Sequence, residues 1–244
     1  MEQSESPHRY LTPERIMIRD TAREFTMNEV LPVANALDPL QGEIPLALRD
    51  KLADMGYFGI RIPEQYGGSG LGVFEYCLVC EQLARGWMSV ASIVARGNGT
   101  MTMSLLDEAR RAHMMPRVVR GEYLGAMSLS EPDTGSDLAS ISCRAERDGD
   151  DWVITGNKYW CTFADGADYI MLVARTSDAP DPKRKHVGLS SFLIEKPRGT
   201  LPPGLSLRTS GSSRRADIVG TPTATGGYAF SLEVSVTDPN AGGP

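Results

Sequence analysis

The residues best suited to chemistry lie in two short segments, and the first runs from Ala126 to Asp137. Its sequence is AMSLSEPDTGSD, which gathers several hydroxyl groups around a proline and a glycine. Pro132 and Gly135 predict a sharp loop directly after a strand. Hydroxyls and amides in such a loop can bind an anion or the edge of a ring, although an ordinary turn at a strand end has the same spacing. The segment alone leaves both interpretations open.

The second segment, Lys158 to Thr162, reads KYWCT and lies one predicted hairpin further along the chain. Trp160 offers a broad face for stacking, and the hydroxyl of Thr162 is expected on the same side of a strand because it comes two residues later. A tryptophan packed inside a β-domain explains the segment equally well by itself. The two segments together favour a site that holds a flat ring and a charged tail.

A glycine-rich stretch, Tyr66 to Gly72, invites comparison with a dinucleotide-binding loop. Its spacing is not GxGxxG, and it joins predicted helices rather than opening a βαβ unit. We therefore interpret it as a tight turn at the entry of a helix.

Metal binding is not predicted. Cys77 and Cys80 form a CxxC, but no second pair of ligands follows at a suitable spacing. With Val73 and Ala84 they are spaced as the buried face of a helix, which is the favoured interpretation. The histidines are too scattered to form a cluster; they are His8, His113 and His186.

The elements that must position the two segments change type near residue 122. Helices are predicted first: Thr12, Pro13 and Glu14 form a start signal, and Gly56 ends a later helix that contains Leu48, Leu52 and Met55. Further helices are expected after Gly72, over residues 89–103, and from Asp107 to near Gly121.

Short β-rich runs separated by turn signals follow. They cover residues 123–130, 142–147, 152–155, 169–174, 189–195 and 228–236. The predicted class is α+β: an all-α N-terminal domain over residues 1–122, then an antiparallel β-barrel or sandwich over residues 123–244, with a divergent tail after about residue 208.

Composition excludes several classes of function. The chain has 244 residues, 41% of them hydrophobic, and a formal net charge of -6 at pH 7. That charge gives no support for nucleic-acid binding. The N-terminal residues show neither a secretory nor a transit pattern, and no apolar run reaches the length of a membrane span. A cytoplasmic protein with no membrane partner is expected.

Four segments, in order along the chain, resemble acyl-CoA dehydrogenases. They are residues 63–71 (PEQYGGSGL), 128–132 (SLSEP) with 135–137 (GSD), 157–162 (NKYWCT) and 192–195 (FLIE). The resemblance covers roughly residues 10 to 207. Asp133 and Thr134 stand where that family usually has a small pair of residues.

The resemblance implies FAD as the cofactor and an acyl-CoA as the substrate. It implies that Ser130 hydrogen-bonds the edge of the isoalloxazine ring, helped by backbone groups of Met127 and Leu129. Trp160 would lie against the ring, and the Thr162 hydroxyl would face N5. Ser136 would contact the pantetheine or phosphate part of CoA. Hydrogen-bond donors along the ring edge stabilise the negative charge of a reduced flavin.

In the family that this chain resembles, the catalytic base is a glutamate of a C-terminal helical domain. No helical periodicity follows residue 200, and nothing nominates Glu131, Glu195 or Glu233 as a substitute. No catalytic residue is therefore assigned. The expectation is a truncated acyl-CoA dehydrogenase that is inactive alone. Its activity would require either the lost C-terminal region or a partner chain, in a homo- or hetero-oligomer, that supplies that domain.

Two alternatives remain open. One is a non-enzymatic subunit that binds FAD or acyl-CoA for another protein. The other is a flavin monooxygenase or nitroalkane oxidase relative built on the same scaffold.

Overall fold

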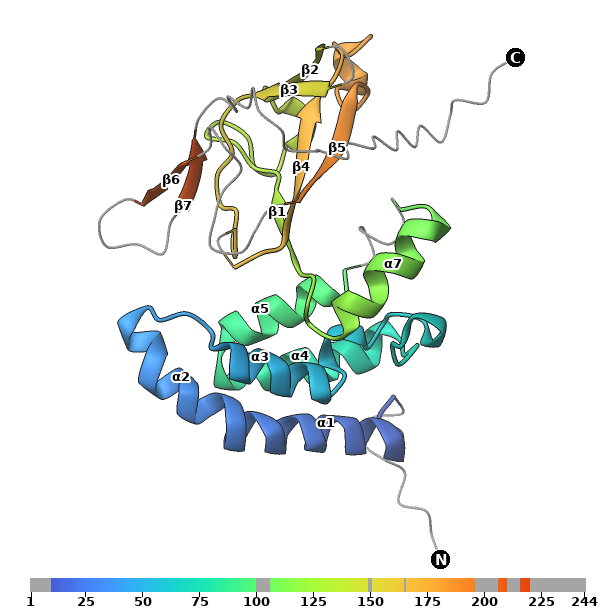
Figure 1. The fold of residues 1–244 in the computed structure, drawn as a ribbon, viewed down its shortest axis with the longest axis vertical. Helices are drawn as coiled ribbons and strands as arrows, with labels where there is room; N and C mark the ends of the chain where they lie inside the picture. Colours follow the sequence, from blue (N-terminus) through green and yellow to red (C-terminus); the bar gives the residue numbers. More distant parts are fainter. Residues whose placement is uncertain are drawn as a thin grey trace, which may run out of the picture. The chain divides into compact units, whose positions relative to one another are not determined.

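The computed structural model describes residues 10–99, 106–148, 151–164, 166–195, 206–209 and 216–219. The chain divides into two compact units, Met1–Leu124 and Gly125–Pro244. The first contains helices and the second contains strands, as Figure 1 shows. This order confirms the predicted α+β class. Within the described ranges, no helix has the length and apolar character needed to cross a membrane.

The first unit is built from α-helices linked by short 3-10 turns and one π-helical turn. In chain order they are α1 Pro13–Phe25, η1 Thr26–Val30, α2 Leu31–Leu37, η2 Asp38–Leu40, α3 Leu46–Asp54, η3 Tyr57–Gly59, η4 Glu64–Tyr66, α4 Val73–Gly86, α5 Met88–Gly97 and α7 Glu108–Val119.

Capping side chains start these helices where the sequence predicts. The Thr12 hydroxyl accepts a hydrogen bond from the Arg15 N–H at 3.4 Å, and the Asp107 carboxylate accepts one from the Arg110 N–H at 2.8 Å. Gly56, with φ of 71°, follows the end of α3. The turn from η4 to α4 is a helix entry, as expected, since Gly70 N–H donates to the Ile62 carbonyl at 2.9 Å just before α4 begins.

The predicted buried face of α4 is wrong. Val73 is 55% exposed and Cys77 is exposed, while the buried residues of the helix are Leu78, Val79, Gln82 and Leu83. Apolar residues lie on more than one side of this helix, so its periodicity does not choose between faces. Packing against α1 and α5 makes that choice.

The second unit contains a mixed sheet and a separate two-stranded sheet. The strands are β1 Gly125–Ser128, β2 Arg144–Asp148, β3 Asp151–Thr155, β4 Tyr169–Arg175, β5 Leu189–Glu195, β6 Ser206–Thr209 and β7 Ala216–Val219. The first five match predicted runs. β6 and β7 were not predicted, and the strand expected over residues 228–236 lies outside the described residues.

The main sheet is not wholly antiparallel. β2–β3 and β4–β5 are antiparallel pairs, but β1 runs parallel to β4, from Gly125 opposite Tyr169 to Ser128 opposite Leu172. The β2–β3 hairpin lies between β1 and β4 in the sequence, and the chain returns to extend beside β1 in the same direction. Periodicity identifies strands but carries no information on their partners.

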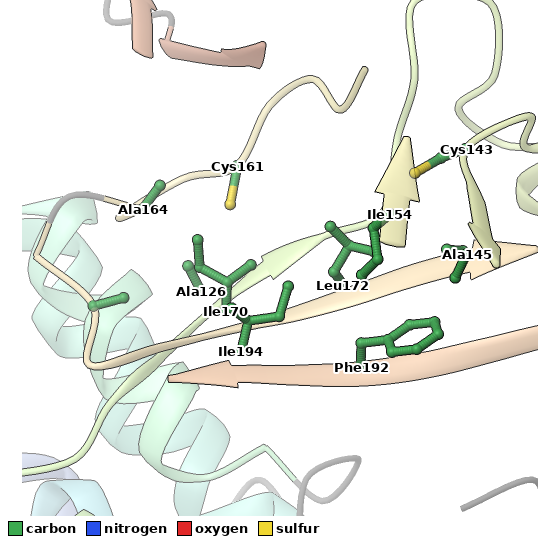
Figure 2. Packing of buried hydrophobic residues seen from close by; sticks show 12 residues of the cluster. Ala126, Cys143, Ala145, Ile154, Cys161, Ala164, Ile170, Leu172, Phe192 and Ile194 are labelled. Atoms are coloured by element: carbon green, nitrogen blue, oxygen red, sulfur yellow. The ribbon is translucent and has the colours of Figure 1, made fainter. Parts of the chain in front are cut away.

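A buried cluster of small and aliphatic side chains holds this unit together (Figure 2). Its members are Ala126, Cys143, Ala145, Ile154, Cys161, Ala164, Ala167, Ile170, Leu172, Ala174, Phe192 and Ile194. Most come from the sheet. Figure 2 shows that Cys161 and Ala164 come instead from the loop after β3, so the second candidate segment is anchored in this core.

The four cysteines should differ sharply in reactivity. Cys77 is exposed, whereas Cys143 and Cys161 are buried. Burial raises the pKa of Cys143 to about 11, with a small opposing effect from the charge of Lys158. Only a thiolate reacts with a maleimide. Timed labelling of the native chain at pH 8, read by peptide mass spectrometry, should modify Cys77 first and Cys143 and Cys161 only after unfolding. Equal rates for Cys77 and Cys161 would contradict this core.

Candidate functional site

A buried ion pair joins the two candidate segments. Lys158 Nζ lies 2.8 Å from Glu131 Oε1, and each side chain is only 3% exposed. Glu131 belongs to the first segment and Lys158 opens the second. Removing two charges from water is costly, and it is tolerated only where the remaining hydrogen-bonding capacity of both groups is also satisfied.

The Glu131 carboxylate meets this condition. Oε1 also accepts from the Cys143 N–H at 2.9 Å, while Oε2 accepts from the Ser142 N–H at 2.6 Å and the Ser142 hydroxyl at 2.8 Å. Burial alone raises the pKa of Glu131, but the hydrogen bonds from Lys158, Ser142 and Cys143 outweigh it and hold the pKa below its ordinary value. The carboxylate is therefore an ionised anchor with its acceptor capacity filled, not a base awaiting a proton.

Two further hydrogen bonds tie the segments together. Lys158 Nζ donates to the Leu129 carbonyl at 2.9 Å, and the Tyr159 N–H donates to the Ser130 carbonyl at 2.8 Å. The β2–β3 hairpin separates these partners in the sequence, as the sequence predicts. The structure thus brings Leu129, Ser130 and the start of the second segment together.

Trp160 does not sit at the end of a strand, which corrects the prediction. β3 ends at Thr155, and Trp160 has φ of 62°, in the left-handed region. A tight turn follows, in which the Thr162 N–H donates to the Trp160 carbonyl at 2.8 Å. The conformation costs about 1–2 kcal/mol for a residue with a Cβ. The buried Cys161 between them compensates by packing in the core.

This turn leaves the residues on either side of Cys161 exposed to solvent. Trp160 is 56% exposed and Thr162 is exposed, while Cys161 is 3% exposed. Two exposed residues, Trp160 and Thr162, thus flank a buried one through a turn instead of through strand alternation.

The remaining residues expected at the ring edge are placed as follows. Met127 lies in β1 opposite Met171, and it is half-buried like Leu129 and Ser130. Among the described residues, the structure gives the Ser130 hydroxyl no hydrogen-bond partner. The hydroxyl of Ser128, which sequence reasoning did not single out, is buried and likewise unpartnered among those residues.

Ser136 lies in a separate part of the first segment. The loop turns back on itself through paired backbone bonds between Glu131 and Thr134, and Ser136 beyond them is exposed. No described hydrogen bond joins Ser136 to Ser130 or Trp160. The structure therefore groups Ser130 with the second segment, and it leaves Ser136 on the loop that leads away from it.

Arg175 and Lys185 hold that loop, a role that the sequence did not assign to either residue. Lys185 Nζ donates to Asp137 Oδ2 at 3.1 Å and to the Ser140 hydroxyl at 2.9 Å. Arg175 Nη2 donates to the carbonyls of Ala139 at 2.8 Å and Lys185 at 3.0 Å. No local sequence signal marks either residue, because each acts across strands that are distant in the sequence.

Glu131 and Lys158 were also missed as a pair. The signal was available: each charged residue directly adjoins a run of residues predicted to lie at a strand end. Of the other acids considered, Glu195 is exposed at the end of β5, and Glu233 lies outside the described residues. Across the described ranges, no three His, Cys, Asp or Glu side chains gather as a metal site would require.

Comparison with known proteins identifies the family. Residues 12–122 match the sequence model of the acyl-CoA dehydrogenase N-terminal domain, and residues 126–218 match that of the acyl-CoA dehydrogenase middle domain. The chain belongs to the acyl-CoA dehydrogenase family, whose cofactor is FAD and whose members are oxidoreductases.

Individual relatives agree with this assignment. The (2S)-methylsuccinyl-CoA dehydrogenase of Cereibacter sphaeroides is 40% identical over 192 residues, which are 78% of this chain and 34% of that protein. The crystal structure of an acyl-CoA dehydrogenase from Geobacillus kaustophilus superposes with a TM-score of 0.76 at 27% identity, covering 88% of this chain and 57% of that one.

A third relative contains the cofactor. A glutaryl-CoA dehydrogenase from Mycobacterium smegmatis in complex with FADH2 has a TM-score of 0.71 and 26% identity, covering 86% of this chain and 53% of that one. These relatives are longer, and the chain spans from 34% to 57% of their lengths.

The residues present fit a flavin. Trp160 presents an accessible aromatic face, and Thr162 beside it is exposed. Ser130 lies next to this segment, because its backbone carbonyl accepts from the Tyr159 N–H at 2.8 Å. Stacking on an indole and donors along a ring edge are the contacts that a flat, electron-accepting ring requires.

Breaking the ion pair from one side should strongly destabilise the β-unit. Glu131→Gln leaves the buried Lys158 charge uncompensated, which should lower the free energy of unfolding by about 3–5 kcal/mol at pH 7. The variant Glu146→Gln removes an exposed carboxylate 3.8 Å from Arg144 and should change it by less than about 0.5 kcal/mol. Urea unfolding followed by circular dichroism measures both. Equal losses in the two variants would contradict the role of the buried pair.

The same pair should give a characteristic pH dependence. Because the pKa of Glu131 is lower in the folded chain than the ordinary value of about 4.5 for a glutamate, the unfolded chain takes up this proton first as the pH falls. The stability from Glu131 is complete above about pH 4.5 and is lost below it. The difference in unfolding free energy between wild type and Glu131→Gln should therefore be constant from pH 7 to 5 and shrink below pH 4.5. A difference that grows with acid would contradict this direction.

Proposed function

We propose that this chain binds FAD and an acyl-CoA thioester as part of a flavin-dependent acyl-CoA dehydrogenase. The observation that carries the proposal is the buried Glu131–Lys158 pair, which joins a loop bearing Ser130 to a loop bearing the exposed Trp160. The sequence relatives named as acyl-CoA dehydrogenases support it. The two domains are proposed to be residues 1–122 and 123–244.

Each residue of the site has a proposed task. Trp160 stacks against the isoalloxazine ring, Thr162 offers its hydroxyl near N5, and Ser130 donates to the ring edge with backbone groups of Met127 and Leu129. When bound, FAD supplies the acceptor for the two electrons removed from the α and β carbons of the acyl group. The protein residues hold the ring and place donors where negative charge accumulates.

Ser136 is proposed to contact the pantetheine or phosphate part of CoA. The loop that carries it is held in place by the contacts of Lys185 with Asp137 and Ser140. Hydrogen bonds from Ser140 and Lys185 lower the pKa of Asp137, so its carboxylate stays charged in this contact. A fixed loop binds a flexible ligand tail at a lower entropic cost than a loop that must first be ordered.

Removal of the α-proton of the acyl group needs a base, and we nominate none among the described residues. Glu131 is unavailable because its oxygens accept four hydrogen bonds and its pKa is lowered. We propose that the base comes from a helical domain outside these 244 residues, provided by a partner chain or by a longer form of the protein. The 244-residue chain is then inactive by itself.

A substitution at Trp160 should change the affinity for FAD without changing the stability of the fold. Trp160→Gly removes the stacking face and relieves the left-handed backbone, so it should weaken FAD binding by about tenfold without lowering the free energy of unfolding. Fluorescence titration with FAD measures the affinity, and urea unfolding the stability. Val153→Ala, at an exposed position of β3, is the matched control and should bind FAD as the wild type does. Equal affinities for all three chains would contradict the stacking role.

Turnover decides between an enzyme and a binding subunit. Purified chain with FAD, an acyl-CoA and a dye acceptor should show no dye reduction, and adding the C-terminal domain of the Cereibacter sphaeroides relative as a separate chain should restore it. (2S)-Methylsuccinyl-CoA, glutaryl-CoA and butyryl-CoA form a suitable panel.

FAD binding without turnover in any mixture would favour the non-enzymatic subunit. Flavin that bleaches only with an external reductant would favour a monooxygenase. Dye reduction by the chain alone would refute the external base.

A further inference from the structure

The Lys158 ammonium makes a contact that charge neutralisation does not require. It donates to Glu131 Oε1 at 2.8 Å, which forms the ion pair, and also to the Leu129 carbonyl at 2.9 Å. Leu129 lies outside the ion pair but directly precedes Ser130. The second contact therefore fixes the orientation of one particular peptide group.

Because the peptide between Leu129 and Ser130 is planar, a contact that fixes the direction of the Leu129 carbonyl also fixes the direction of the Ser130 N–H. In a trans peptide the carbonyl of one residue and the N–H of the next point in opposite directions. The described chain contains no cis peptide. Because the Leu129 carbonyl accepts from the buried ammonium, the Ser130 N–H must point away from that ammonium.

The following peptide is fixed in the same manner. The Ser130 carbonyl accepts from the Tyr159 N–H, and the Glu131 N–H on the other side of that peptide donates to the Thr134 carbonyl at 2.8 Å. Ser130 is thus held by both of its peptide groups. Its own N–H donates to no backbone carbonyl among the loops and turns that the structure describes. The backbone N–H of Ser130 is therefore a donor whose direction is fixed by the peptide groups on both sides.

We infer that Lys158 is a positioning residue, which holds the Ser130 N–H away from the buried ion pair through the Leu129 carbonyl so that it can donate to the edge of a bound flavin. The identity of the acceptor rests on the proposed function. The effect is one of orientation, because Glu131 neutralises the lysine charge at 2.8 Å. An anionic ring edge gains most from donors that are already aimed before it binds, because no reorganisation is needed.

The test uses a variant that keeps charge balance. Glu131→Gln/Lys158→Met removes both charges, which avoids the penalty of an unpaired buried ion, and it removes the donor to Leu129. Residual dipolar couplings of backbone N–H groups, measured by NMR on the cofactor-free chain, report the direction of the Ser130 N–H. We expect this coupling to change while those of β4 and β5 stay at wild-type values. An unchanged Ser130 coupling would overturn the inference.

FAD affinity provides the second readout. The double variant should bind FAD at least tenfold more weakly than wild type. Arg144→Met, which breaks an exposed pair with Asp178 at 2.8 Å in the same unit, should bind as wild type does. A changed coupling with wild-type affinity would overturn the role toward the flavin.

The two measurements test different claims: FAD binding tests the proposed function, and the N–H couplings test the role of Lys158. If the wild-type chain binds no FAD, alone or with the added C-terminal domain, the proposed function fails, and the couplings still decide whether Lys158 sets the Ser130 peptide. The double variant is used instead of Lys158→Met alone, because the single substitution would leave the buried Glu131 carboxylate without its partner.

Discussion

A charge buried in a protein must find nearly all of its hydrogen bonds inside, and this constraint organises the β-unit. The Glu131 carboxylate gathers donors from Lys158, Ser142 and Cys143, so two other stretches of chain are tied to the loop that carries it. Loss of any donor would leave part of a desolvated charge unsatisfied. The loop after β1, the entry to β2 and the loop after β3 therefore cannot move independently of one another.

The loop after β3 combines two opposite requirements. It must keep Cys161 in the core and also leave Trp160 and Thr162 accessible. A β-strand satisfies such alternation automatically, but this loop achieves it with Trp160 in a left-handed conformation, closed by the hydrogen bond from the Thr162 N–H. Backbone strain of this kind persists where the surrounding contacts fix it, and it is often found where a ligand binds. Here the fixing contacts are the core cysteine on one side and Lys158 on the other.

Local sequence signals predicted the elements well and their partners poorly. Thr12 and Asp107 mark helix starts because capping is a contact within a few residues, and the runs that became β1 to β5 alternate or are β-branched for reasons local to each strand. The parallel pairing of β1 with β4 depends on residues far apart, so no local pattern reports it. The prediction of the buried face of α4 was wrong for a similar reason. Cys77 and Leu78 are both apolar, and only the packing of α1 and α5 decides which of them is buried.

For the site, residue types and motif order determined which two segments matter: hydroxyls around a glycine turn, then a tryptophan flanked by a hydroxyl. Residue types and their order along the chain can be recognised from the sequence without knowledge of the fold. The tertiary structure alone decided how the segments meet. It buried Lys158 and Glu131 together, aimed the peptide before Ser130, and turned Trp160 outward. Those outcomes arise from desolvation and packing among residues that the sequence separates by an entire hairpin, and both forces act through space.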